Sequence, residues 1–150
     1  MNNLWLSELV LVLVIPILVF AFGTHFDKKG APRNINSFFG YRTARSVRSW
    51  ETWSFAHAKI GRLWKLIGLI MVPVSAGLFA ILIKKSEDTM SVFGLLIMLL
   101  QLVPIIVSIV IVEKSLKQSF NERGERTEES LLAEQQKQNE KAAKKTAKKS

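Results

Sequence analysis

Arg42 and His57 are the side chains of this sequence best suited to chemistry, and both lie in one connecting segment. The Arg42 guanidinium can grip a phosphate or a carboxylate in bidentate fashion, and the His57 imidazole can act as a general base. With Asn36 or Ser46 assisting, this set predicts one candidate function, a small membrane enzyme or binding protein that acts on lipid phosphate. In the simpler interpretation, Arg42 contacts lipid phosphate without specificity and His57 is a hydrogen-bonded packing residue.

A catalytic centre built from these groups would be unusually sparse. The 150 residues include two histidines and no cysteine, so composition excludes disulfides, thiolate zinc sites and cysteine nucleophiles. The sequence also lacks a His-Glu-x-x-His metal motif, a glycine-rich phosphate loop and a nucleophile elbow. We therefore expect no catalytic residue, no metal site and no cofactor, and we favour a binding protein over an enzyme.

Three long apolar blocks must position these side chains. A helix needs about 20 apolar residues to cross roughly 30 Å of hydrocarbon, and residues 4–22, 66–83 and 91–112 each provide such a block. We interpret the first block as a span and not as a signal peptide, because no Lys or Arg precedes Lys28. The sequence predicts an all-α membrane protein whose three transmembrane helices form a membrane domain in residues 1–112.

Each predicted span contains one proline and few polar residues. We expect three kinked helices in which neighbouring helices satisfy the carbonyls freed by Pro16, Pro73 and Pro104. Gln101, near the middle of the third span, is expected to hydrogen-bond a neighbouring helix, while Glu8 can reach the headgroup region. Three small residues of the second span, Ala76, Gly77 and Ala80, are expected to allow close approach of another helix. That helix can belong to a partner, but we favour the other two spans.

Lys and Arg are distributed unevenly between the ends of the predicted spans. Residues 23–65 contain nine of them and the tail after Val112 contains ten, whereas residues 84–90 contain two, which are offset by Glu87 and Asp88. Three spans put the two basic segments on the same side of the membrane. The positive-inside rule then places both segments in the cytoplasm and the N-terminus outside. The formal charge of +9 thus reports membrane orientation, and no nucleic-acid recognition motif accompanies it.

An amphipathic helix is expected over residues 49–64, between the first and second spans. Its apolar stripe recurs at intervals of three and four residues, and basic residues occupy the opposite face. Such a helix favours the membrane interface, where indole rings lie at headgroup depth, although the stripe can equally pack on the other helices. The stripe contains Trp50, Trp53, His57, Ile60 and Trp64, and the opposite face contains Arg48, Glu51, Lys59 and Arg62.

Ahead of this helix, residues 36–46 have the composition of a turn with helix-capping residues. Gly40 permits a backbone angle that other residues avoid. Thr43, Ser46 and Ser49 are plausible N-caps, so we expect the turn to place Arg42 near the start of a helix and just under the membrane surface.

This segment also resembles the signature of the SdpI family of bacterial membrane proteins. The similar residues are Asn36, Gly40-Tyr41-Arg42-Thr43, Ser46, Trp53, Ala56-His57 and Gly61, at the family's spacing. The resemblance implies a protein of the bacterial plasma membrane that protects its producer from a membrane-active peptide toxin, or that sequesters a transcriptional regulator at the membrane. It also implies candidate binding residues, namely Asn36, Gly40, Arg42, Thr43, Ser46 and Trp53, and we add Tyr41 and His57 by position.

The tail, residues 113–150, is rich in Lys, Glu, Gln and Ala and lacks aromatic residues after Phe120, so it cannot bury a core of its own. We expect a cytoplasmic segment of fluctuating helix or disorder. Its lysines can hold it against an anionic leaflet, each contributing on the order of 1 kcal/mol, or simply keep it solvated. Expected partners are membrane lipids and a toxin peptide or transcriptional regulator. Formation of a homo-oligomer is a further alternative. A channel function would require it, because three helices alone cannot line much of a pore.

Overall fold

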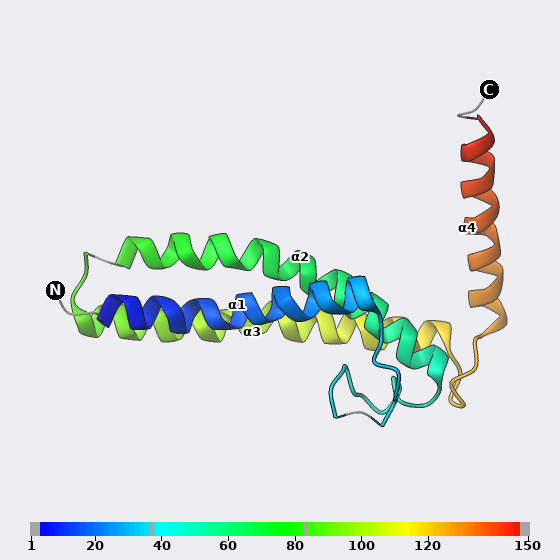
Figure 1. The fold of residues 1–150 in the computed structure, drawn as a ribbon, viewed down its shortest axis with the longest axis horizontal. Helices are drawn as coiled ribbons and strands as arrows, with labels where there is room; N and C mark the ends of the chain where they lie inside the picture. Colours follow the sequence, from blue (N-terminus) through cyan, green and yellow to red (C-terminus); the bar gives the residue numbers. More distant parts are fainter. Residues whose placement is uncertain (1–3, 37, 83, 148–150) are drawn as a thin grey trace.

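The computed structural model describes residues 4–36, 38–82 and 84–147, and these residues fold almost entirely into helices (Figure 1). The helices are α1 (Leu4–Lys29), α2 (Trp50–Leu82), α3 (Glu87–Ser119) and α4 (Glu128–Ala147). The first three are long and apolar enough to cross a membrane. The described residues contain no strand beyond an isolated β-bridge between Phe120 and Arg126. The prediction of an all-helical protein with three helices able to span a membrane is therefore confirmed for the described residues.

The helices α1, α2 and α3 lie side by side along the long axis of the molecule (Figure 1). Their outer surface is apolar, with Leu69, Leu99 and Ile106 each more than half exposed. Such a surface is stable where hydrocarbon replaces water as the solvent. The start of α1 and the α2–α3 connection lie at one end of this bundle, and the α1–α2 and α3–α4 connections lie at the other (Figure 1).

The helices α1 and α2 touch through glycines, which allow their backbones to approach closely. A Cβ atom on Gly23 would collide with the backbone of Lys65, and one on Gly68 would lie 2.5 Å from the backbone nitrogen of Phe20. Gly61 contacts Phe26 and Asp27 in the same way. The prediction that Gly77 closely approaches the other two helices is wrong, because nothing lies within 4 Å of a Cβ built there. Approach of a partner at Gly77 stays a prediction. Small residues do bring α1 and α2 together, but at Gly61 and Gly68, which lie two turns or more before Gly77 in α2.

Gln101 joins all three spanning helices inside the bundle. Its Nε2 donates to the backbone oxygen of Val12 in α1 (3.0 Å) and to the hydroxyl of Ser75 in α2 (2.9 Å). The Val12 carbonyl lies four residues before Pro16, which has no N–H to offer it. Both expectations for this region are therefore confirmed, since Gln101 hydrogen-bonds a neighbouring helix and satisfies a carbonyl freed by a proline.

The residues described between the first and second spans form no separate interfacial helix. Residues 50–64 form the first turns of α2, which continues without a break to Leu82. Within α2 no proline occurs before Pro73, and the junction residues 62–66 are compatible with a helix, so nothing stops the helix at the start of the apolar block. The tryptophan stripe mainly packs inward, because Trp53 and Ile60 are fully buried, whereas Trp50 is half exposed.

The tail begins as a continuation of α3, which runs to Ser119 before the chain turns sharply. Gly124 has a φ of +80°, a left-handed conformation that suits glycine, within this turn. The helix α4 then leaves across the long axis of the bundle (Figure 1). The division into a membrane domain and a cytoplasmic tail stays a prediction.

Candidate functional site

The described part of the segment between α1 and α2, residues 30–36 and 38–49, folds over one end of the bundle (Figure 1). We refer to this segment, together with Trp53 and His57 beneath it, as the cap. The indole Nε1 of Trp53 donates to the backbone oxygen of Pro32 at 2.9 Å. Because Trp53 is fully buried, this bond fixes the start of the cap to the first turn of α2.

His57 holds the middle of the cap through both nitrogens of its ring. Its Nε2 accepts a hydrogen bond from the backbone N–H of Tyr41 at 2.9 Å, so the ring proton lies on Nδ1 and is donated to the Trp53 carbonyl at 2.8 Å. The ring is fully buried and meets the Phe26 ring edge-on at 4.9 Å between centroids. With the acceptor nitrogen engaged by the backbone, His57 is placed as a hydrogen-bonded packing residue.

Gly40 lies directly over the rings of Trp53 and His57. Its φ is +140°, a conformation that L side chains rarely adopt, and a Cβ atom would lie 2.7 Å from His57 Nε2 and 2.8 Å from the Trp53 ring. Backbone angle and lack of space therefore independently require glycine here. The expectation of an unusual backbone angle at Gly40 is confirmed.

Tyr41 connects the cap to α3. Its ring is buried, and its hydroxyl donates to a carboxylate oxygen of Glu113 at 3.1 Å and lies 3.5 Å from the Ile109 carbonyl. Burial, followed by the negative charge of Glu113, raises the pKa of the Tyr41 phenol well above its usual value. Nothing in the local pattern pointed to Glu113, which is 72 residues away in the sequence.

Two serine–threonine pairs shape the end of the cap. The Thr43 N–H donates to Ser46 Oγ (2.9 Å) while the Ser46 N–H donates to Thr43 Oγ1 (3.2 Å), a reciprocal arrangement that closes the turn. Ser49 and Thr52 repeat this arrangement at the start of α2, at 3.0 and 3.2 Å. The predicted N-cap position is confirmed for Ser49, which precedes α2, whereas Thr43 caps only the short 44–47 turn. The prediction is wrong for Ser46, which lies inside that turn and donates its hydroxyl to the Tyr41 carbonyl.

Asn36 and Arg42 lie on the outside of the cap. Arg42 is exposed, and its Nη1 donates to the Ile35 carbonyl at 3.2 Å. The Asn36 N–H donates to the side chain of Asn34 at 2.8 Å. Arg42 precedes the short 44–47 turn and not a long helix, so the predicted position near a helix start holds only for that turn.

Two phenylalanines ahead of Gly40 extend the cap, and the sequence reasoning had not singled them out. The Phe39 ring packs against Phe22, Phe26 and His25 of α1, with centroid distances of 5.4 to 6.0 Å. Phe38 is fully exposed. The adjacent aromatic residues were a visible signal, since an exposed phenylalanine next to a basic turn is typical of a binding or membrane-interface surface.

The family of the chain follows from comparison with known proteins. The family model described as the SdpI/YfhL protein family matches residues 33–112, which is more than half of the chain. The chain belongs to the SdpI/YfhL family. No curated protein and no solved structure matched the chain in the corresponding searches.

The SdpI/YfhL match covers the cap from residue 33 onward, α2 and most of α3. It therefore includes all of the candidate site residues, and six of them form one connected cluster. The clustered residues are Gly40, Tyr41, Thr43, Ser46, Trp53 and His57. Asn36 and Arg42 stay outside this cluster, on the exposed rim.

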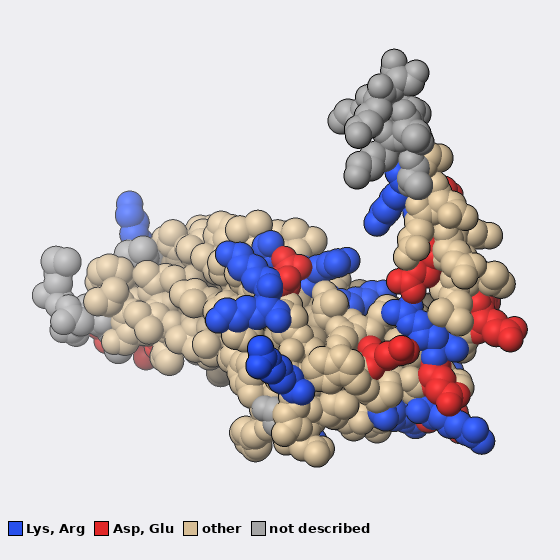
Figure 2. Space-filling view, turned by 45° about the vertical axis from the view of Figure 1, so that its right-hand side comes forward, with Lys and Arg blue, Asp and Glu red and all other residues tan. Residues whose placement is uncertain are grey.

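Charged side chains of this SdpI/YfhL protein gather at the end of the molecule with α4, and much of the remaining surface is uncharged (Figure 2). Asp27 forms an ion pair with Lys65 at 2.9 Å and a longer one with Arg62 at 3.9 Å. Among the described residues, no group of three or more His, Asp or Glu side chains could hold a metal ion.

Proposed function

We propose that this SdpI/YfhL protein protects a bacterium from a membrane-active antimicrobial peptide by binding the peptide at the cap. The supporting observation is that the polar groups of the signature residues form hydrogen bonds within the cap, which make its surface rigid. The rings of Trp53 and His57 hold backbone groups of the cap, which leaves Phe38 and Arg42 exposed at its rim. A pre-formed aromatic and cationic rim is suited to binding because little conformational entropy is lost there.

We further propose that the protein lies in the bacterial plasma membrane with its N-terminus outside and its C-terminus in the cytoplasm. The cap and α4 lie at the same end of the bundle (Figure 1), and both carry many Lys and Arg residues. The positive-inside rule then directs this end to the cytoplasm. In this orientation the cap would meet a peptide that has inserted across the bilayer, or a transcriptional regulator that approaches from the cytoplasm.

Expression of the chain in a sensitive bacterium, followed by challenge with a panel of membrane-active peptides, tests protection. We expect survival against at least one peptide to rise, and Gly40→Leu to abolish the gain because its side chain displaces Trp53 and His57. Gly77→Leu is the matched control, because there is space for a side chain at Gly77. Unchanged killing across a broad panel at confirmed membrane levels of the protein would contradict the proposal.

A second candidate function is action on lipid phosphate through Arg42 and His57. The exposed position of Arg42 supports the phosphate contact, whereas the engagement of both His57 nitrogens speaks against a general base. Purified protein can be incubated with phospholipids and isoprenoid phosphates while phosphate release is measured. Turnover that is lost in both Arg42→Ala and His57→Gln would favour this function over peptide binding.

A further inference from the structure

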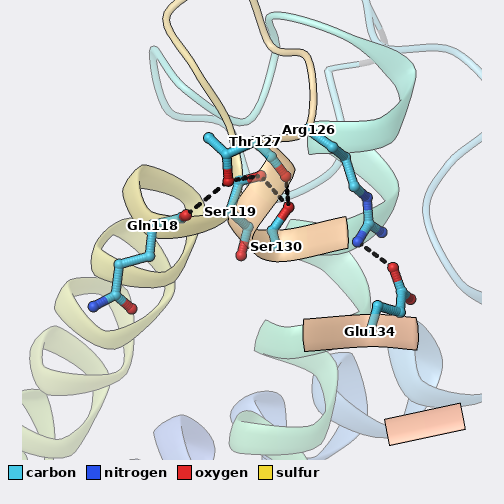
Figure 3. A network of polar contacts seen from close by, with 6 residues as sticks. All are labelled: Gln118, Ser119, Arg126, Thr127, Ser130 and Glu134. Carbon is cyan, nitrogen blue, oxygen red and sulfur yellow. Dashed lines mark hydrogen bonds and ion pairs between the residues drawn. The ribbon is translucent and has the colours of Figure 1, made fainter. Parts of the chain in front are cut away.

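The base of α4 is fixed to the end of α3 by a compact set of hydrogen bonds (Figure 3). The Ser130 hydroxyl donates to the Ser119 carbonyl at 3.0 Å, and the Thr127 N–H donates to the same carbonyl at 3.1 Å. The Thr127 hydroxyl also reaches the Gln118 carbonyl at 3.3 Å. These bonds set the direction in which α4 leaves the bundle.

The turn between α3 and α4 is also fixed to the start of α2. Arg48 Nη1 donates to the Glu122 carbonyl at 2.6 Å, and the Ser49 hydroxyl donates to the Gly124 carbonyl at 2.7 Å. As a result α4 extends across the long axis of the bundle (Figure 1). A bundle that spans the membrane therefore places α4 roughly parallel to the membrane surface.

An open cavity of about 690 Å³ separates the first turns of α4 from α2. The α2 wall is formed by Phe55, Leu63, Lys59 and Arg62, and the α4 wall includes Lys137. Arg126 completes the cationic lining at the base. The cavity thus combines an apolar strip with four cationic side chains. The cations complement the phosphate of a phospholipid headgroup, and the apolar strip complements the first part of its acyl chains.

Glu134 is the one carboxylate among the lining residues. It pairs with Arg126 at 2.6 Å (Figure 3), and the Arg126 guanidinium also lies 5.3 Å from the centroid of the Phe120 ring. Lys59 Nζ donates to the Ser115 hydroxyl at 2.6 Å and retains two further N–H groups. Four cations and one carboxylate line the cavity, and Asp27, outside the lining, also forms the longer ion pair with Arg62 at 3.9 Å. Lys59 and Lys137 carry the remaining positive charge that is available to an anionic ligand.

The α2 wall of the cavity begins at the depth of the headgroups and continues beyond it. Arg62 and Lys59 precede Leu66, the start of the apolar block, by four and seven residues. At about 1.5 Å per residue Arg62 lies about 6 Å from that point, within a headgroup layer that is roughly 5–7 Å thick on each side. Lys59 lies about 10 Å from the same point, just beyond that layer. Long cationic side chains at this depth reach lipid phosphates directly.

The basic face of α4 continues beyond the cavity. Ser130, Ala133 and Lys137 line the cavity, and at about 100° per residue Lys141 and Lys144 follow on the same side of the helix. Asn139 lies on the opposite side. A row of lysines facing the same way as the cavity is suited to a negatively charged surface.

We propose that the cavity between α2 and α4 binds the headgroup of an anionic phospholipid, and that the lysine face of α4 lies on the anionic membrane surface. This site is separate from the cap rim and does not depend on the proposed protective function. It assigns α4 a membrane-binding role that lies outside the residues matched by the family model.

Native mass spectrometry of the delipidated full-length protein in detergent tests the headgroup site. We expect phosphatidylglycerol to bind more tightly than phosphatidylcholine, and the Lys59→Gln/Lys137→Gln variant to lose roughly tenfold or more of the phosphatidylglycerol affinity. The charge-preserving Lys59→Arg/Lys137→Arg variant should retain the preference. Lys84→Gln/Lys85→Gln is the matched control, because it removes the same charge at the other end of the bundle.

Three outcomes would overturn the headgroup proposal. The first is equal binding of the two lipids by the unmodified protein, and the second is an equal loss of affinity in the Lys84/Lys85 control. The third is complete displacement of phosphatidylglycerol by millimolar inorganic phosphate, which would indicate a site for free phosphate.

A second experiment tests the position of α4, and it uses the absence of cysteine from the chain. An environment-sensitive label is attached at Ala133→Cys or Asn139→Cys, and its accessibility to acrylamide is measured in nanodiscs. In phosphatidylglycerol we expect the label at position 133 to be several-fold less accessible than that at 139, and in phosphatidylcholine the difference should shrink. Equal accessibility in phosphatidylglycerol would overturn the placement of α4 on the membrane.

Discussion

The imidazole of His57 accepts a hydrogen bond from the backbone N–H of Tyr41 at 2.9 Å, which ties the cap to the first turns of α2. Replacement by alanine leaves that buried N–H unsatisfied and opens a cavity beside Phe26. We expect His57→Ala to lower the free energy of unfolding by about 2–4 kcal/mol. Thermal unfolding in detergent measures the effect. His25→Ala, at an exposed position, should cost much less, and equal losses would contradict this account.

Gly40→Ala and Gly77→Ala form a matched pair of substitutions. At Gly40 a methyl group meets the rings of His57 and Trp53 and the backbone angle is unfavourable, so we expect a loss of about 2 kcal/mol or more. At Gly77 the methyl group has space and alanine favours a helix, so stability should stay unchanged or rise by up to about 1 kcal/mol. The same unfolding assay compares the two, and a more damaging change at Gly77 would show that the cap is not rigid.

Gln101 and Pro16 should show energetic coupling. Gln101→Leu removes the donor that satisfies the Val12 carbonyl, and we expect a loss of about 1–2 kcal/mol. In a Pro16→Ala background the helix recovers its own N–H for that carbonyl, so the cost of Gln101→Leu should be smaller. A double-mutant cycle measures the coupling. Additive effects would mean that Gln101 matters only through Ser75 or through packing.

Tyr41 is the only tyrosine in the chain, so tyrosinate absorbance reports its titration alone. Because burial and Glu113 raise its pKa, we expect the phenol to stay neutral in the folded protein at pH values where a free tyrosine ionises, near pH 10. The unfolded chain releases this proton first, so stability should be fully present below about pH 10 and fall as the pH rises further. Glu113→Gln should move the titration to lower pH. An ordinary tyrosine titration in the folded protein would contradict the buried Tyr41–Glu113 contact.

The length of apolar blocks was enough to predict the three spans, because a hydrocarbon solvent admits few alternatives to a helix. It did not predict that α2 runs unbroken from Trp50, since the change from amphipathic to apolar sequence resembles a boundary although no residue there breaks a helix. Periodicity placed Trp53 and His57 on one stripe. Whether that stripe lies at the membrane interface or in the protein core depends on which segment folds over it, and periodicity does not reveal this.

Contacts between distant segments were the least predictable part of the cap. Gly40 could be recognised as a turn residue, but its fit against His57 and Trp53 requires the folded chain. The Tyr41–Glu113 contact joins residues with no shared pattern. Close helix approach was expected at Gly77 and occurs at Gly61 and Gly68, because composition reveals small residues and not which face of the helix meets a neighbour.

Single cysteines placed at Lys85 and at Lys144 give the most direct test of the membrane arrangement, because the chain has no cysteine of its own. Intact cells are treated with a membrane-impermeant maleimide, and labelling is compared before and after permeabilisation. We predict that Lys85→Cys is labelled in intact cells and that Lys144→Cys is labelled only after permeabilisation. Labelling of Lys144→Cys from outside the cell, or of both positions from the same side, would contradict three spans with the cap and α4 on the cytoplasmic face.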